Sequence, residues 1–102
     1  EAVELLTRAI RLEPDNGAFF DSLGWAYYRM GELEEAERYL GKARQQMAGH
    51  EHTEQAVILD HAGDIANALG KRHEAIDHWR RALDLTPESE KLQKKLGTGS
   101  LP

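Results

Sequence analysis

One short phrase occurs twice in this chain and constrains its fold more than any other feature. Asp-x-x-Gly, six further residues and a second glycine read DSLGWAYYRMG over residues 21–31 and DHAGDIANALG over residues 60–70. The segments EAVELLTRAIRLEP (1–14), EAERYLGKARQQMA (35–48) and EAIDHWRRALDLTP (74–87) likewise carry alanines at matching positions. Small residues repeated at fixed offsets indicate a chain built from repeated structural units.

Each unit is predicted to be a helical hairpin. Apolar residues recur every three or four positions in both halves of the unit, which is the period of an α-helix. Gly31 and Gly70 end the first halves, as glycines commonly do in helices, and leave only about two residues for the turn. Small residues at facing positions predict two antiparallel helices in close contact. These pairs, 12 residues apart in each unit, are Gly24 with Ala36 and Gly63 with Ala75.

This pattern is typical of the tetratricopeptide repeat, and the chain resembles that family over nearly its whole length. The repeat of about 34 residues carries a large residue, Leu-Gly, Tyr, Ala, an aromatic residue, Ala and Pro at fixed positions. The resemblance implies an all-α solenoid of helical hairpins wound into a right-handed superhelix. The first full repeat matches at Phe20, Leu23, Gly24, Tyr27, Ala36, Leu40 and Ala43, and the second at Leu59, Ala62, Gly63, Ala66, Ala75, Trp79, Ala82 and Pro87.

The resemblance also divides the chain into four parts. Because the sequence opens in mid-pattern, we expect it to be a piece of a longer array. The parts are the second helix of a truncated repeat (1–16), a repeat with a five-residue extension (17–55), a second repeat (56–89), and a capping helix with a flexible tail (90–102).

Two segments leave their local structure open. The extension over residues 48–55 either lengthens a helix or forms a loop, and Thr53 is a candidate helix cap within it. At the C-terminal end, Thr86 and Pro87 are predicted to begin the capping helix. Leu92 and Leu96 are then expected to close the core of the array.

Composition excludes several classes of protein. The formal net charge is −5, with acidic and basic residues interspersed, whereas nucleic-acid binding needs a basic face. The chain has no cysteine, so it has no disulfide or thiolate metal site. No apolar run approaches the about 18 residues of a membrane span.

A closer resemblance concerns the source. DSLGWAYYRMGELEEAERYL followed by DHAGD is similar to the C-terminal repeats of a group of bacterial tetratricopeptide proteins, some of which are exported or lipid-anchored. The resemblance implies a bacterial protein. It leaves open the cytoplasm or, for the full-length protein, the periplasm and outer membrane.

The first helices of stacked hairpins line a concave groove, and family likeness identifies the positions that face it. Trp25 and Tyr28 are the predicted anchors, because such side chains bury a large area and keep a polar tip; alternatively, Trp25 packs between neighbouring repeats. The aspartates favour a basic partner; alternatively, they are solvated acids or partners of Arg29. The candidate peptide-binding residues are Asp21, Trp25, Tyr28, Arg29, Asp60, Asp64 and Asn67.

Two functional hypotheses follow. The first is a non-catalytic scaffold that binds a protein or peptide in the groove. The alternative is a structural or self-assembly end-module of a longer array. For the alternative, we expect self-association through the edge of the N-terminal helix, which lacks cover on one side at Val3, Leu5, Leu6 and Ile10.

The histidines are not predicted to form a reactive centre. His50 and His52 lie in the extension, but a functional zinc site needs three or four placed ligands. His61 shares a helix face with Asp64 and is expected to be a hydrogen-bonded surface residue. His73 and His78 are predicted to face water. We therefore expect no catalytic residue, no metal and no cofactor, and we do not expect an enzyme.

Overall fold

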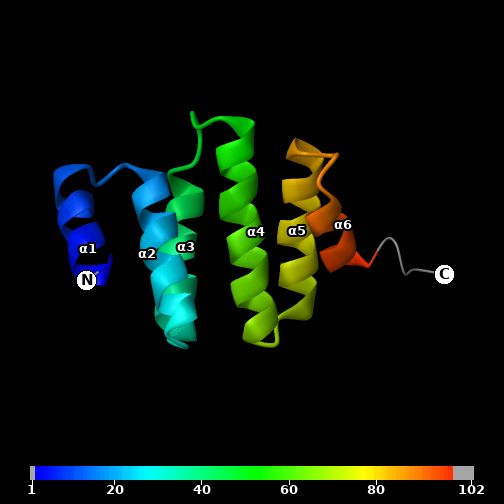
Figure 1. Ribbon diagram of the computed structural model, residues 1–102, viewed down its shortest axis with the longest axis horizontal. Helices are drawn as coiled ribbons and strands as arrows, with labels where there is room; N and C mark the ends of the chain where they lie inside the picture. Colours follow the sequence, from blue (N-terminus) through cyan, green and yellow to red (C-terminus); the bar gives the residue numbers. More distant parts are fainter. Residues whose placement is uncertain (1, 98–102) are drawn as a thin grey trace.

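The computed structural model describes residues 2–97 as six helices, each packed against the next one along the chain (Figure 1). No strand occurs within those residues, and the prediction of an all-α helical-repeat solenoid is confirmed. The tail predicted to be flexible lies almost entirely outside them. The helices are α1 (Ala2–Leu12), α2 (Gly17–Arg29), α3 (Leu33–Gln45), α4 (His52–Ala68), α5 (Arg72–Leu85) and α6 (Glu90–Leu96).

The two glycines that close the repeated phrase make the hairpin turns. Gly31 and Gly70 both have φ of 82°, a left-handed conformation that glycine adopts without strain. After α2, the N–H of Glu32 donates to the carbonyl of Tyr27 at 2.9 Å, and the same bond joins Lys71 to Ala66 after α4 at 2.8 Å. These bonds satisfy the last carbonyls of each helix. Each turn therefore connects two antiparallel helices with only a few residues, as the sequence predicted.

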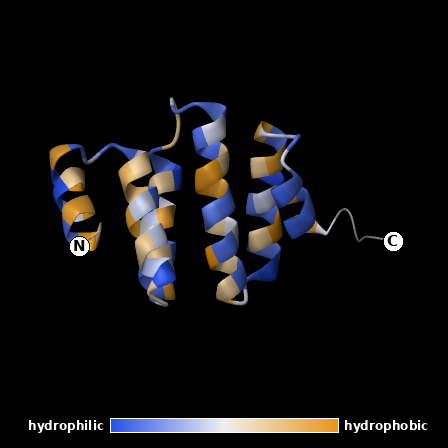
Figure 2. Cartoon of the chain, in the orientation of Figure 1, coloured by the Kyte–Doolittle hydropathy of each residue, from blue (hydrophilic) through white to orange (hydrophobic). Residues whose placement is uncertain are grey.

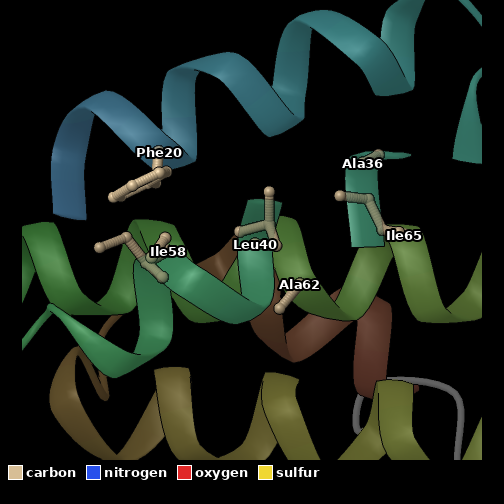
Figure 3. Packing of buried hydrophobic residues seen from close by; sticks show 7 residues of the cluster. Phe20, Ala36, Leu40, Ile58, Ala62 and Ile65 are labelled. Atoms are coloured by element: carbon tan, nitrogen blue, oxygen red, sulfur yellow. The ribbon is translucent and has the colours of Figure 1, made fainter. Parts of the chain in front are cut away.

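Buried apolar side chains form two clusters in the described part of the chain, and α4 belongs to both. The first cluster lies between α2, α3 and α4 and includes Phe20, Leu40 and Ile58 (Figure 3). The second lies between α4, α5 and α6 and includes Leu59, Trp79 and Leu92. Because α4 is buried on two sides, it is the central helix of the stack.

The helices of each hairpin lie as close as the small residues predicted. A Cβ atom on Gly24 would come within 3.1 Å of the carbonyl oxygen of Ala36 and would also overlap a methyl group of Leu40. On Gly63 it would overlap the indole ring of Trp79. Gly24 thus allows a backbone contact, whereas Gly63 makes room for a large buried ring.

The helix ends differ from the prediction at two places. α4 begins at His52 after Glu51, so Thr53 lies inside the first turn and does not cap the helix. The extension therefore forms a loop and also lengthens α4 to 17 residues, against 13 in α2. Ser89, not Thr86, caps α6 by accepting a hydrogen bond from the N–H of Leu92 at 3.2 Å.

The outermost helix, α1, has no buried residue. Its apolar side chains stand out in Figure 2, and Leu5 and Leu12 are 61% and 83% exposed. Ile10 packs against the first cluster. One side of α1 therefore contacts α2, while the leucines lie on its uncovered side.

Candidate functional site

The predicted binding residues lie on α2 and α4, which are the first helices of the two hairpins and contact each other. Residues three or four positions apart share one side of a helix. Asp21, Trp25 and Tyr28 therefore project together from α2. Asp60 and Asp64 do the same on α4, and we call this surface of α2 and α4 the inner face.

An aromatic stack forms the α2 half of the inner face. The ring of Trp25 lies over Tyr28 with centroids 4.5 Å apart, and over His61 of α4 with centroids 3.9 Å apart. Interplanar angles of 21° and 18° make both contacts parallel. We call Trp25, Tyr28 and His61 the aromatic shelf; all three are partly exposed.

The carboxylate of Asp21 holds the His61 ring of the aromatic shelf in place. This carboxylate lies 2.7 Å from Nδ1 of His61, and Asp21 as a whole is 8% exposed. A buried carboxylate needs such a partner, because leaving it unpaired costs on the order of 1–3 kcal/mol or more of desolvation. His61, which was expected to be a hydrogen-bonded surface residue, takes its partner from α2 and is partly buried.

Asp60 and Asp64 are neutralised by the last helix. Nζ of Lys95, on α6, lies 2.7 Å from Asp60 and 2.9 Å from Asp64, and Nζ of Lys91 lies 3.2 Å from Asp60. Burial opposes the charge of the Lys95 ammonium, but the hydrogen bonds that it donates to both aspartates outweigh this effect and raise the pKa of Lys95. The alternative that Arg29 pairs with these acids was wrong; the lysines of α6 do so.

The two remaining candidate residues lie in the last turns of α2 and α4. Arg29 and Asn67 are exposed. The side-chain oxygen of Asn67 accepts a hydrogen bond from Nη1 of Arg72 at 3.1 Å. The polar groups of the inner face are thus largely paired, either with one another or with side chains of α5 and α6, and its aromatic rings stack on one another.

His78 is a buried residue that the sequence analysis placed in water. It is 8% exposed, and no hydrogen-bond partner of its Nδ1 lies among residues 2–97. Burial lowers the pKa of His78, and the nearby charges of Arg44 and Arg81 lower it further. The signal was present in the sequence, because His78 lies between buried Ala75 and Ala82 at helical spacing.

His50 and His52 are the histidines that the sequence analysis considered as metal ligands. Nδ1 of His50 lies 2.9 Å from a carboxylate oxygen of Glu54. Across residues 2–97, no three His, Cys, Asp or Glu side chains converge in a way that would hold a metal ion.

The described helices are also too short or too polar for any of them to cross a lipid bilayer.

The fold and the inner face define a class: a helical-repeat protein made of stacked antiparallel hairpins. The tetratricopeptide repeat model matches residues 20–88, which is more than half of the sequence. The chain belongs to the tetratricopeptide repeat family. Repeats of this family typically serve as scaffolds for protein–protein interaction, and that general role extends to this chain.

One bacterial relative supports the same assignment. A TPR repeat-containing protein of Pseudomonas aeruginosa is 51% identical over 51 residues, a stretch that covers 50% of this chain. The same stretch covers only 9% of that relative. The similarity therefore concerns a small part of a much longer protein.

Proposed function

We propose that this chain holds a protein or peptide partner against its inner face, and that the aromatic shelf makes the main contact. The observation that carries the proposal is the position of Trp25, which is partly exposed and stacked between Tyr28 and His61. Tryptophan and tyrosine dominate many protein interfaces because they bury a large area with few rotatable bonds.

Preorganisation favours the shelf over other exposed rings. The bond between Asp21 and His61 holds the imidazole in place, and the imidazole in turn supports the indole of Trp25. Less side-chain freedom is then lost when a partner binds, and this improves affinity. Arg29 and Asn67 are exposed on the same two helices and offer polar contacts to the same partner.

The two tryptophans provide an internal comparison for the test. Trp25 lies on the shelf, whereas Trp79 is 3% exposed in the second core cluster, and the chain contains no other tryptophan. Peptides selected for binding to the full chain from a display library are added to ¹⁵N-labelled protein. The indole N–H signal of Trp25 should shift, and that of Trp79 should stay in place.

A substitution completes the test. Trp25→Ala should weaken binding of the selected peptides about tenfold or more, as truncation of a central aromatic residue does. Tyr39→Ala, which removes a ring from α3, is the control and should leave the affinity within about twofold. Selected peptides that bind equally well to Trp25→Ala would refute a shelf-centred interface.

A second candidate function is self-assembly through α1, with a second copy of the chain as the partner. The exposed Leu5 and Leu12 favour it, because large apolar side chains on one helix face tend to find a complementary surface. Sedimentation should then show a concentration-dependent dimer that Leu5→Glu abolishes and Val57→Glu, on α4, preserves. A monomer at all concentrations up to the millimolar range would exclude this function.

A further inference from the structure

α6 lies on the inner face in the manner of a bound ligand. Lys95 bridges Asp60 and Asp64, one helical turn apart on α4, and Lys91 reaches Asp60 from the preceding turn of α6. The side chain of Asp60 is only 8% exposed. The acidic part of the inner face is therefore occupied by a segment of the same chain.

Apolar contacts complete the docking of α6. Leu92 is 3% exposed within the second core cluster, and Leu96 packs against that cluster. Lys91, Leu92 and Lys95 follow one another at helical spacing and thus form one side of α6. This side carries a specific pattern: a cation, a leucine beside it, and a second cation one turn later.

The attachment of α6 is local and limited. The helix has seven residues, and a helix shorter than about 12 residues is not stable alone in water. At the seam between α4 and α6, a shallow pocket remains open beside Leu92 and Val57, and Val57 is 47% exposed. Short terminal elements with few buried contacts open at low free energy. α6 thus binds at a specific site on α4, but the free energy needed to detach it is low.

From this arrangement we infer that α6 is an internal ligand of the inner face, which competes with a partner of the same chemistry. That partner is a basic amphipathic helix with lysine or arginine at two positions one turn apart and a leucine-like residue next to the first. Asp60 and Asp64 bind its cations, and the hollow that Leu92 now fills takes its apolar side chain. The inference rests on the proposed function, because it names a partner for the same face.

The competition has a defined strength. A segment joined by the short connection from Thr86 to Ser89 has an effective concentration on the order of millimolar at its own site. An external helix has to compete with α6 at this effective concentration. The intact chain therefore binds the external helix only weakly. Weakening the bond of Lys95 to α4 lowers the threshold. The ends of the inner face then differ: the aromatic shelf is always available, and the acidic seat becomes available when α6 leaves.

A fluorescein-labelled peptide with the sequence of residues 86–97 serves as the probe, with the full chain as the receptor. Lys95→Glu places a like charge beside Asp60 and Asp64, which should release α6 and increase affinity for the peptide about tenfold or more. Lys94→Glu changes the net charge equally at an exposed position of the same helix and should bind the peptide as the wild type does. Adding Asp60→Asn and Asp64→Asn to Lys95→Glu should remove the gain.

Hydrogen exchange provides the second readout. Amides of residues 92–96 should exchange faster in Lys95→Glu than in Lys94→Glu, while those of α2 and α3 remain unchanged. If far-UV circular dichroism shows that Lys95→Glu is unfolded, Lys95→Met, which keeps the side-chain stem, takes its place. Equal peptide affinity in the wild type and the Lys95 variant, or a gain that survives loss of both aspartates, would overturn the inference. A shift of the Trp25 signal with other ligands would then still stand, so the two proposals fail separately.

Discussion

Replacing Gly63 with alanine tests the close packing on which the second hairpin depends. The added Cβ would overlap the indole ring of Trp79, and even the ring atom Cε2 would lie only 2.9 Å away. Trp79 is 3% exposed, and its rigid ring has no flexible end that swings aside. The two helices must therefore move apart. Gly41, inside α3, is the matched control, because a Cβ there meets nothing within 4 Å.

Two opposing effects set the magnitude. Alanine favours a helix over glycine by about 1 kcal/mol, whereas overpacking a core costs about 1–3 kcal/mol. The overlap with Trp79 involves three ring atoms, so the cost lies toward the upper end of that range. Gly63→Ala should therefore lower the free energy of unfolding by about 1–2 kcal/mol. Gly41→Ala should raise it by about 1 kcal/mol.

Urea unfolding followed by circular dichroism measures both changes. In thermal unfolding, a change of 1 kcal/mol corresponds to about 4–8 °C for a domain of this size. Gly24→Ala should fall between the two variants, because the nearest obstacle there is a terminal methyl group of Leu40. If Gly63→Ala proves as stable as Gly41→Ala, the helices of the second hairpin are not in the contact described, and the packing argument is wrong.

Acid should destabilise the fold through His78, because burial in the folded state lowers its pKa below the ordinary value of 6.5. As the pH falls below 6.5, the unfolded chain takes up the proton first, and the folded state loses stability. Urea unfolding from about pH 8 to about pH 5 should show a smaller loss for His78→Gln than for the control His73→Gln; equal losses would exclude His78 as the cause. Asn16→Ala removes the cap bond to the N–H of Ala18, 2.9 Å long, and should cost about 1 kcal/mol. The same measurement on Asp15→Ala, beside it, should show a smaller change.

Contacts within one hairpin were predictable from sequence because they depend on spacing alone. The distance between Gly24 and Ala36 along the chain places them opposite each other once a two-residue turn is assumed. Gly31 and Gly70 indicate that turn, because the residue after the end of the first helix needs a positive φ. Fold class, helix pairing and the close approach all follow from those local signals.

Contacts between hairpins were not predictable in the same way. The bond from His61 to Asp21 joins residues 40 positions apart, and Lys95 reaches Asp60 over 35. Helical spacing shows which side of a helix a residue occupies, but not how one hairpin is rotated on the next. The first pairing depends on that rotation and the second on how α6 packs against α4, so spacing along the sequence did not reveal the partners of these acids.

Competition between local signals explains the helix starts. Thr86 and Ser89 are both residues that cap helices, and the sequence alone does not rank them. In the structure the hydroxyl of Thr86 donates to the carbonyl of Ala82, at 3.1 Å, and so belongs to the end of α5. Ser89 is left to begin α6. His78 is a different case. The helical period placed it on the buried side of α5, but its polarity argued against burial.

The longer α4 makes the two hairpins unequal at one end. Its 17 residues exceed the 13 of α2, and Figure 1 shows its N-terminal turn rising above the neighbouring helix ends. One helical turn amounts to about 5.4 Å, and this one carries exposed polar side chains such as His52 and Glu54. An array of identical units would have a level rim, whereas this rim has a step. This step gives the rim a polarity that the repeated units themselves lack.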